Sequence, residues 1–162
     1  MLQVLYRSIA CFPEFDVSDL AIVREALAFN PGQGITGYLW RAEDQFFQAL
    51  HGPEQALRGL LPRIESDRRH HSFEVLMEAT TEAATPFDGW SMGYDVVAVQ
   101  MAGLGILGNG ARPDISAPLA AQLWADMAQA ARDAAQFGSS FPYARQAGES
   151  EATYISRLTR GA

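Results

Sequence analysis

The residue with the most distinctive chemical setting is Gln48, a primary amide placed between apolar neighbours. On an expected strand over residues 45–51, Phe46, Gln48 and Leu50 share one face, because side chains alternate along a strand. That face should be buried, and a buried amide without partners costs roughly 1–3 kcal/mol. Tyr6, on another expected strand, offers a hydroxyl partner. The residues alone leave open whether this pair is an ordinary core hydrogen bond or part of a site.

The elements that must position these two residues follow the order βαββαββ. Strands are expected where apolar and polar residues alternate, and helices where apolar residues recur at helical spacing. The expected strands span residues 2–10, 35–40, 45–51, 73–79 and 90–94, and the expected helices begin after Asp16 and at Pro53. Asn30-Pro31-Gly32 should end the first helix near Phe29, because the residue before a proline avoids helical geometry. This order predicts an α+β, ferredoxin-like sheet with both helices on one face.

The C-terminal part of the chain has a different pattern. Residues 98–114 are rich in glycine and predict a linker, and Ser116 can cap a helix over about 117–137. A weaker helix is expected over 149–158. Neither helix could fold alone, so the extension over 115–162 should cover the second face of the sheet. The expected contacts join Leu119, Leu123 and Met127 to Leu5, Ile9, Phe47 and Ala49.

Composition limits the functional class. The chain has 162 residues and a net charge of −7, so general binding to nucleic-acid phosphates is not expected. All twelve basic residues are arginines, which excludes lysine-dependent phosphate loops and Schiff bases. One cysteine can form neither an internal disulfide nor a structural zinc site. With no leader and no long apolar stretch, we expect a cytoplasmic protein that does not enter the membrane.

Five short motifs occur together in the first 96 residues. They are Tyr6-Arg7-Ser8, Asn30-Pro31 followed by Gly34-Ile35-Thr36-Gly37, Phe46-Phe47-Gln48-Ala49-Leu50-His51-Gly52-Pro53, Asp67-Arg68-Arg69-His70 and Trp90-Ser91-Met92-Gly93. In this order they resemble the BLUF family of blue-light receptors that use flavin. The region over 1–97 is therefore identified as a flavin-binding sensor domain of that kind.

The resemblance implies a non-covalent flavin, FAD with FMN as the alternative, held between the two core helices. In that family, the tyrosine that matches Tyr6 donates an electron and a proton to the excited ring. The glutamine that matches Gln48 bridges this tyrosine to the flavin and rearranges in light. Asn30 matches a ring-binding asparagine, and Arg63 and Asp67 match positions near the pyrimidine side. Such a domain is a light sensor and not an enzyme.

For several residues the sequence leaves an alternative role open. Trp90 and Met92, expected on one face of the last strand, are both candidates for the residue nearest Gln48, or both simple core residues. Asn30 could instead cap its helix, and Arg63 with Asp67 could form a surface pair. His70 and His71 are expected at the surface, and no metal site is expected. The sequence departs from the family at His51, Phe29 and Thr85-Pro86, which bears on cofactor affinity.

The expected output is indirect. The residues after the sensor region are too few for an effector enzyme, so the signal should pass through the last strand and the C-terminal helices. The receiver would be an unidentified downstream protein or a homo-oligomer, most simply a dimer. Two alternatives remain, a cofactor-free dimerisation module and a flavin-dependent enzyme on the same sheet. The colour of the purified protein distinguishes all three.

Overall fold

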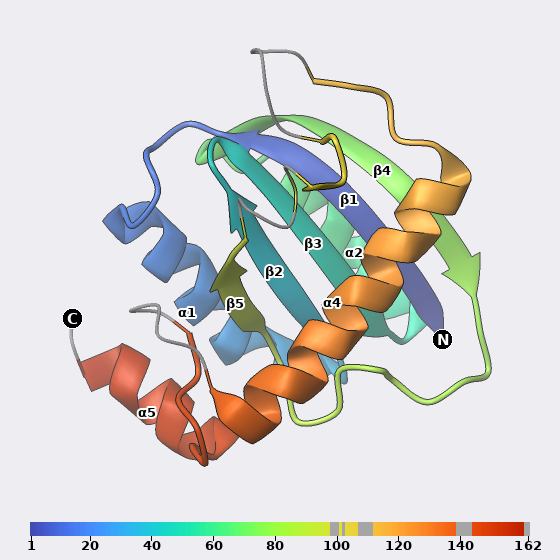
Figure 1. Cartoon of the computed structure of the whole chain (residues 1–162). Coiled ribbons are helices and arrows are strands. Elements are labelled where there is room, and N and C mark those ends of the chain that lie inside the picture. Colours follow the sequence, from blue (N-terminus) through green and yellow to red (C-terminus); the bar gives the residue numbers. More distant parts are fainter. Residues whose placement is uncertain (98–100, 102, 107–111, 139–143, 161–162) are drawn as a thin grey trace.

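The computed structural model describes residues 1–97, 101, 103–106, 112–138 and 144–160 (Figure 1). Within these ranges five strands form one sheet with the order β4-β1-β3-β2-β5. The strands are β1 (Leu2–Ala10), β2 (Thr36–Ala42), β3 (Gln45–Gly52), β4 (His70–Thr80) and β5 (Gly93–Val96). The helices labelled in Figure 1 are α1 (Val17–Gln33), α2 (Glu54–Glu65), α4 (Ala117–Phe137) and α5 (Glu151–Arg160). The predicted α+β, ferredoxin-like fold is confirmed.

The two central strands place the predicted pair side by side. β1 and β3 run antiparallel, and Tyr6 lies directly opposite Gln48 in their register. Directly opposed residues on one face have their Cβ atoms about 4.5–5.5 Å apart, so their side chains can meet. β2 pairs antiparallel with the other edge of β3, and β5 pairs parallel with the outer edge of β2.

Helices α1 and α2 cover one face of the sheet, behind the strands in Figure 1. The Asp16 side chain accepts a hydrogen bond from the Ser18 amide, which confirms the predicted N-cap. The predicted end at Asn30-Pro31 is wrong, because α1 continues to Gln33 and ends at Gly34 with φ of 66°. Pro31 lies in the last turn, where the carbonyls of Asn30 and Pro31 still accept hydrogen bonds from Ile35 and Gly34. Pro31 itself has no backbone N–H to donate within the helix.

Helix α4 crosses the opposite face of the sheet, in front of the strands in Figure 1. Its predicted bounds are confirmed, and the Ser116 hydroxyl accepts a hydrogen bond from the Leu119 amide as the expected N-cap. The side chains it buries are Ala120, Leu123, Met127, Ala128, Ala131 and Ala134. Leu119, expected among them, is only partly buried. The many alanines let the helix lie close to β2 and β4.

The C-terminal helix α5 does not cover the sheet but lies beside α1 (Figure 1). The Arg24 guanidinium of α1 donates to the Leu158 carbonyl of α5. The predicted linker over 98–114 falls partly outside the described residues, although Met101 and Ile106 within it are buried. No helix in the described part of the chain is both long and apolar enough to span a membrane.

The last strand begins later than the sequence suggests. Pairing with β2 starts at Gly93, which lies opposite Tyr38. A Cβ atom on Gly93 would lie 2.2 Å from the Tyr38 ring, so only glycine allows this close approach. Trp90 and Met92 therefore lie in an irregular segment before β5, and the prediction of a strand over residues 90–94 is wrong for that segment.

A buried ion pair that the sequence analysis missed ties α1 to the sheet. Asp19 accepts a hydrogen bond from Arg41 at 2.8 Å and another from the Tyr94 hydroxyl at 2.7 Å. Both members of the ion pair are at most 1% exposed. The expected strands over residues 35–40 and 45–51 leave Arg41 in the connection between them, but β2 includes Arg41 and the turn consists of residues 43–44. The guanidinium also lies 4.8 Å from the ring centroid of Phe46.

We predict that Asp19→Asn strongly destabilises the fold. Removing one partner of a buried ion pair leaves the other charge uncompensated, at a cost of about 3–5 kcal/mol. Urea unfolding followed by circular dichroism measures the change. Glu54→Gln is the control, because it breaks the half-exposed pair with Arg58, for which a loss below about 1 kcal/mol is expected. Equal losses in the two variants would show that the buried pair has no special role.

Candidate cofactor-binding site

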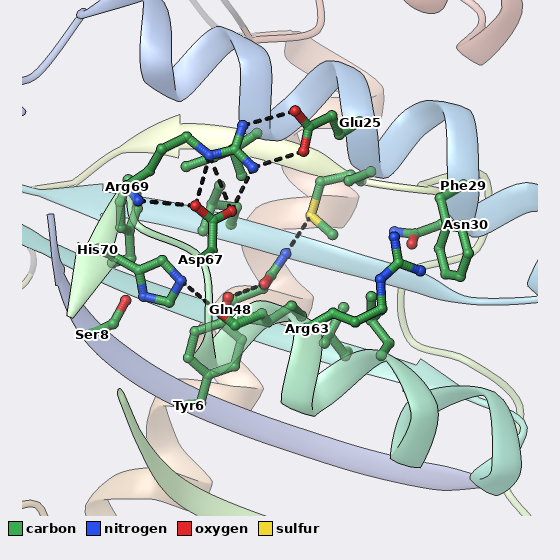
Figure 2. A pocket seen from close by; sticks show the side chains of 18 residues that line it. Tyr6, Ser8, Glu25, Phe29, Asn30, Gln48, Arg63, Asp67, Arg69 and His70 are labelled. Atoms are coloured by element: carbon green, nitrogen blue, oxygen red, sulfur yellow. Dashed lines mark hydrogen bonds and ion pairs between the residues drawn. The ribbon is translucent and has the colours of Figure 1, made fainter. Parts of the chain in front are cut away.

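A cavity lies between the sheet and the two helices α1 and α2 (Figure 2). It encloses about 170 Å³, whereas a single buried water needs roughly 10–15 Å³. Packing defects in protein cores are rarely larger than one water, so this space is built for a ligand. Six predicted site residues line it: Tyr6, Asn30, Gln48, Arg63, Asp67 and Met92.

The amide of Gln48 is held at both ends. The Tyr6 hydroxyl donates to Gln48 Oε1, and Gln48 Nε2 donates to Met92 Sδ at 3.2 Å. Figure 2 shows the Tyr6 and Gln48 side chains directed toward each other. Burial raises the pKa of Tyr6 well above its ordinary value, and the Asp67 carboxylate adds to the effect. Tyr6 is therefore a protonated donor.

Met92 reaches Gln48, but Trp90 does not. The Trp90 indole nitrogen donates to the Ala131 carbonyl of α4 at 3.0 Å, on the opposite side of the sheet. The expectation that both side chains share one face is wrong, because the residues precede β5 and do not follow the alternation of a strand. Gly37 provides space for Met92, since a Cβ atom there would lie 3.3 Å from the Met92 methyl and 2.5 Å from the Ala49 carbonyl.

Asn30 lies on the last turns of α1, and its side chain is buried against the segment after the fourth strand. Its Nδ2 donates to the Ser91 carbonyl at 2.7 Å. The alternative role as a helix cap is wrong, because the α1 terminus is closed by Gly34. The Asn30 amide oxygen remains available to a ligand in the cavity that it lines.

One side of the cavity carries charged groups from α1 and from the loop between α2 and β4. Arg69 donates to Asp67 at 2.9 Å and to Glu25 of α1 at 2.7 Å, and Figure 2 shows it between the two carboxylates. Burial acts to raise the pKa of Asp67, but the hydrogen bonds from Arg69 outweigh it and hold the pKa below its ordinary value. Asp67 is therefore a carboxylate at neutral pH.

Arg63 lies apart from this cluster. Its guanidinium carbon is 4.8 Å from the centroid of the Phe29 ring, a cation–π contact. The surface ion pair of Arg63 with Asp67, which the sequence also allowed, is wrong, because Asp67 pairs with Arg69 instead. Phe29 and Arg63 form one wall of the cavity. This wall offers an aromatic face and a guanidinium to a flat, polar-edged ligand.

Two polar atoms in the cavity wall lack a protein partner. Among the described residues, Ser8 Oγ and His70 Nδ1 are buried without a hydrogen bond. The expectation that His70 lies at the surface is wrong: it is 7% exposed, and its Nε2 is 2.7 Å from the Ile64 carbonyl. Unpaired buried groups are costly, so they fit a ligand with polar atoms. A flavin, with apolar faces and carbonyl and nitrogen edges, suits this wall.

Sequence reasoning missed four polar residues of this cavity: Ser8, Glu25, Arg69 and His70. Ser8 shares the strand face of Tyr6, so its position was available from alternation. Arg69 and His70 belong to the Asp67-Arg68-Arg69-His70 motif. Charged and imidazole side chains after a helix are also typical of a solvent-exposed turn, so the motif alone does not place them in a cavity. Among the described residues, no group of three or more His, Cys, Asp or Glu side chains could hold a metal ion.

A cavity lined by apolar and charged side chains, with a buried amide bonded at both ends on a ferredoxin-like sheet, is the arrangement of a cofactor-binding domain. The family model described as BLUF, sensors of blue-light using FAD, matches residues 1–93. The chain belongs to the BLUF family, and its first 93 residues form a blue-light flavin sensor. No curated protein matches the chain.

Solved structures support the same assignment. The dark-state structure of BlrB, a BLUF protein, superposes with a TM-score of 0.65 at 24% identity, covering 80% of this chain and 96% of BlrB. The photo-activated state of BlsA gives a TM-score of 0.63 at 24% identity, covering 78% and 94%. Klebsiella pneumoniae BlrP1 gives 0.54 at 32% identity, covering 78% of this chain but 33% of BlrP1. The first two likenesses show the fold.

The buried histidine of the cavity predicts a pH dependence of stability. Burial lowers the pKa of His70 below its ordinary value of 6.5. The unfolded chain then binds a proton at higher pH than the folded chain, so the free energy of unfolding should fall as the pH drops below about 6.5. Urea unfolding of flavin-free protein between pH 7.5 and 5 measures this slope.

His70→Gln should make the slope shallower. His71→Gln is the matched control, because His71 is the adjacent residue and is exposed. An identical slope in His70→Gln and the parent protein would show that burial does not keep His70 neutral.

Proposed function

We propose that Tyr6, Gln48 and Met92 are the light-sensitive switch of this blue-light sensor. Asn30, Arg63 and Asp67 would hold the flavin, and residues 1–97 would be the sensor unit. The observation that carries the proposal is the Tyr6–Gln48–Met92 chain of hydrogen bonds at the wall of the cavity. The bound flavin supplies the absorption of blue light and an acceptor for an electron.

The two neighbours of Gln48 favour one orientation of its amide. Tyr6 is a donor because its pKa is raised, and it faces the amide oxygen. Met92 has no donor, and its sulfur is only a weak acceptor, so it suits the amide nitrogen. A rotated amide would place its oxygen, and a tautomeric amide an altered nitrogen, against Met92. Either change would weaken the present pairing of the Gln48 nitrogen with the Met92 sulfur. A change at Tyr6 is therefore transmitted as a change in the preferred state of Gln48.

FAD is the proposed cofactor, with FMN as the alternative. The family description names FAD, whereas a structure of Klebsiella pneumoniae BlrP1, 36% identical to this chain over 62% of its length, contains FMN. Because the flavin should bind without a covalent bond, heat or acid precipitation should release it. Chromatography of the supernatant then identifies it, with FAD expected at about one per chain. Protein supplied with flavin that releases none would contradict the proposal.

The proposed output passes from the segment before β5 to α4 and α5, and then to a downstream protein or a second copy of the chain in the cytoplasm. Trp90 of this segment bonds α4 through the Ala131 carbonyl. This arrangement supports a receptor that acts by contact and not as an enzyme. Light-regulated relatives join the same fold to effector regions, as in a bacterial light-regulated adenylyl cyclase, of which this chain covers 31%.

Substitutions at the amide test the switch. Gln48→Leu should keep the flavin but lose the reversible red shift of its absorption spectrum in blue light. Leucine has no donor and acceptor groups that could exchange places. Tyr6→Phe should also lose the shift, since it removes the hydroxyl donor. Difference absorption spectra before and after illumination measure the result.

Gln45→Leu is the matched control for this test. Gln45 lies on the same strand but on the opposite face, and it is buried to a similar extent. Its variant should shift to the red as the parent protein does. A normal photocycle in Gln48→Leu would remove Gln48 from the mechanism.

A further inference from the structure

The four residues from Gly89 to Met92 form an irregular segment between the cavity and the C-terminal part of the chain. Met92 bonds Gln48 on the cavity side, while Trp90 bonds α4 on the other side. The Trp90 carbonyl accepts a hydrogen bond from the Gly37 amide of β2 at 3.0 Å. Ser91, between them, has both of its backbone groups bonded to side chains rather than to a neighbouring strand.

The two side chains that bond the backbone of Ser91 come from different parts of the molecule. Asn30 Nδ2, in the cavity wall, donates to the Ser91 carbonyl at 2.7 Å. The Ser91 amide donates to Glu151 Oε1, also at 2.7 Å. Glu151 is the first residue of α5, outside the residues matched by the family model. Asn30 and Glu151 therefore hold the two peptide groups that meet at the Ser91 Cα, one from the cavity and one from the C-terminal helix.

Other contacts from the C-terminal part hold the same segment. Arg145 donates to the Gly89 carbonyl at 3.1 Å, and its guanidinium carbon lies 4.5 Å from the Trp90 ring centroid. The buried Tyr154 of α5 packs edge-on against Trp90, with ring centroids 6.4 Å apart. These contacts fix where α5 begins relative to Ser91, so the Glu151 carboxylate has a defined position.

We propose that Glu151 is a positioning residue of the light site, which acts through Ser91 on Asn30 and Met92. Its charged acceptor binds the Ser91 amide, and a hydrogen bond to a charged group is stronger than a neutral one, so it fixes the position of Ser91. A fixed Ser91 keeps its carbonyl in reach of the Asn30 amide and keeps Met92 against Gln48. Because coupling between two sites is reciprocal, light-driven change at Gln48 would alter the hold on α5. The proposal rests on the switch proposed above.

A purely structural role for Glu151 makes a different prediction. Acidic residues in the first turn of a helix favour the helix by about 0.3–1 kcal/mol through its dipole, and Glu151→Ala would remove this effect as well. Ala152→Gly separates the two roles. Ala152 is an exposed residue of the same helix turn, and glycine there weakens the helix without touching the acceptor of Ser91.

The test compares Glu151→Ala, Glu151→Gln and Ala152→Gly in the full-length protein. The first readout needs no cofactor: hydrogen exchange of the Ser91 amide in flavin-free protein should accelerate about tenfold in Glu151→Ala, as for the loss of a hydrogen bond to a charged group. The second is the dark recovery of the FAD-loaded protein after blue light. Recovery should be several-fold slower in Glu151→Ala, because a loosened Met92 stabilises the dark orientation of Gln48 less.

Glu151→Gln keeps an acceptor oxygen at the same reach and should restore most of both readouts, whereas Ala152→Gly should match the parent. Unchanged exchange and recovery in Glu151→Ala would overturn the proposal. Equal effects of Glu151→Ala and Ala152→Gly, or a glutamine variant as impaired as the alanine variant, would also overturn it. Failure of the proposed function looks different, since the parent protein itself would then show no red shift.

Discussion

The amide of Gln48, buried in the middle of a sheet, imposes the main constraint on this structure. An amide there needs an acceptor for its nitrogen and a donor for its oxygen, and Met92 and Tyr6 provide them. The requirement for Tyr6 places β1 directly beside β3, in the register that opposes the two residues. The requirement for Met92 brings a segment distant in sequence to the far side of β2, where Gly37 leaves room for it. Both requirements are met at the wall of the cavity, so the atoms that satisfy each other in the core also line the space for a ligand.

The two faces of the sheet then have different tasks. The face with α1 and α2 contains a cavity and the unpaired Ser8 and His70 atoms, so it cannot be packed as tightly as an ordinary core. The other face is closed by α4, which buries its own Leu123 and Met127 together with several alanines. Burying such side chains contributes about 1.5–3 kcal/mol each. The stability that the sensor face lacks can therefore come from a helix that lies outside the region matched by the family model.

The regular elements could be predicted from the sequence, whereas the irregular and polar parts could not. The bounds of α4 followed from a serine cap and an apolar stripe, and Tyr6 and Gln48 followed from strand alternation. Trp90 and Met92 were assigned to one face because alternation was extended into a segment that has no partner strand before Gly93. His70 was expected at the surface because polar residues usually lie there, and Arg41 fell in the connection between two expected strands. Only the three-dimensional packing shows that Arg41 has Asp19 as a buried partner and that His70 lines a cavity.

The irregular conformation of residues 89–92 is what allows this segment to connect the cavity with the tail. The Trp90 carbonyl bonds the Gly37 amide of β2, so the amide and carbonyl of the next residue, Ser91, face away from β2. They are bonded to Glu151 and Asn30, so the position of Ser91 depends on one side chain from the cavity and one from α5. Regular pairing resumes at Gly93, which anchors the segment at one end. A short stretch held by side chains and fixed at its end can shift by a small amount without unfolding the sheet, and its neighbours Trp90 and Met92 would carry that shift to opposite faces.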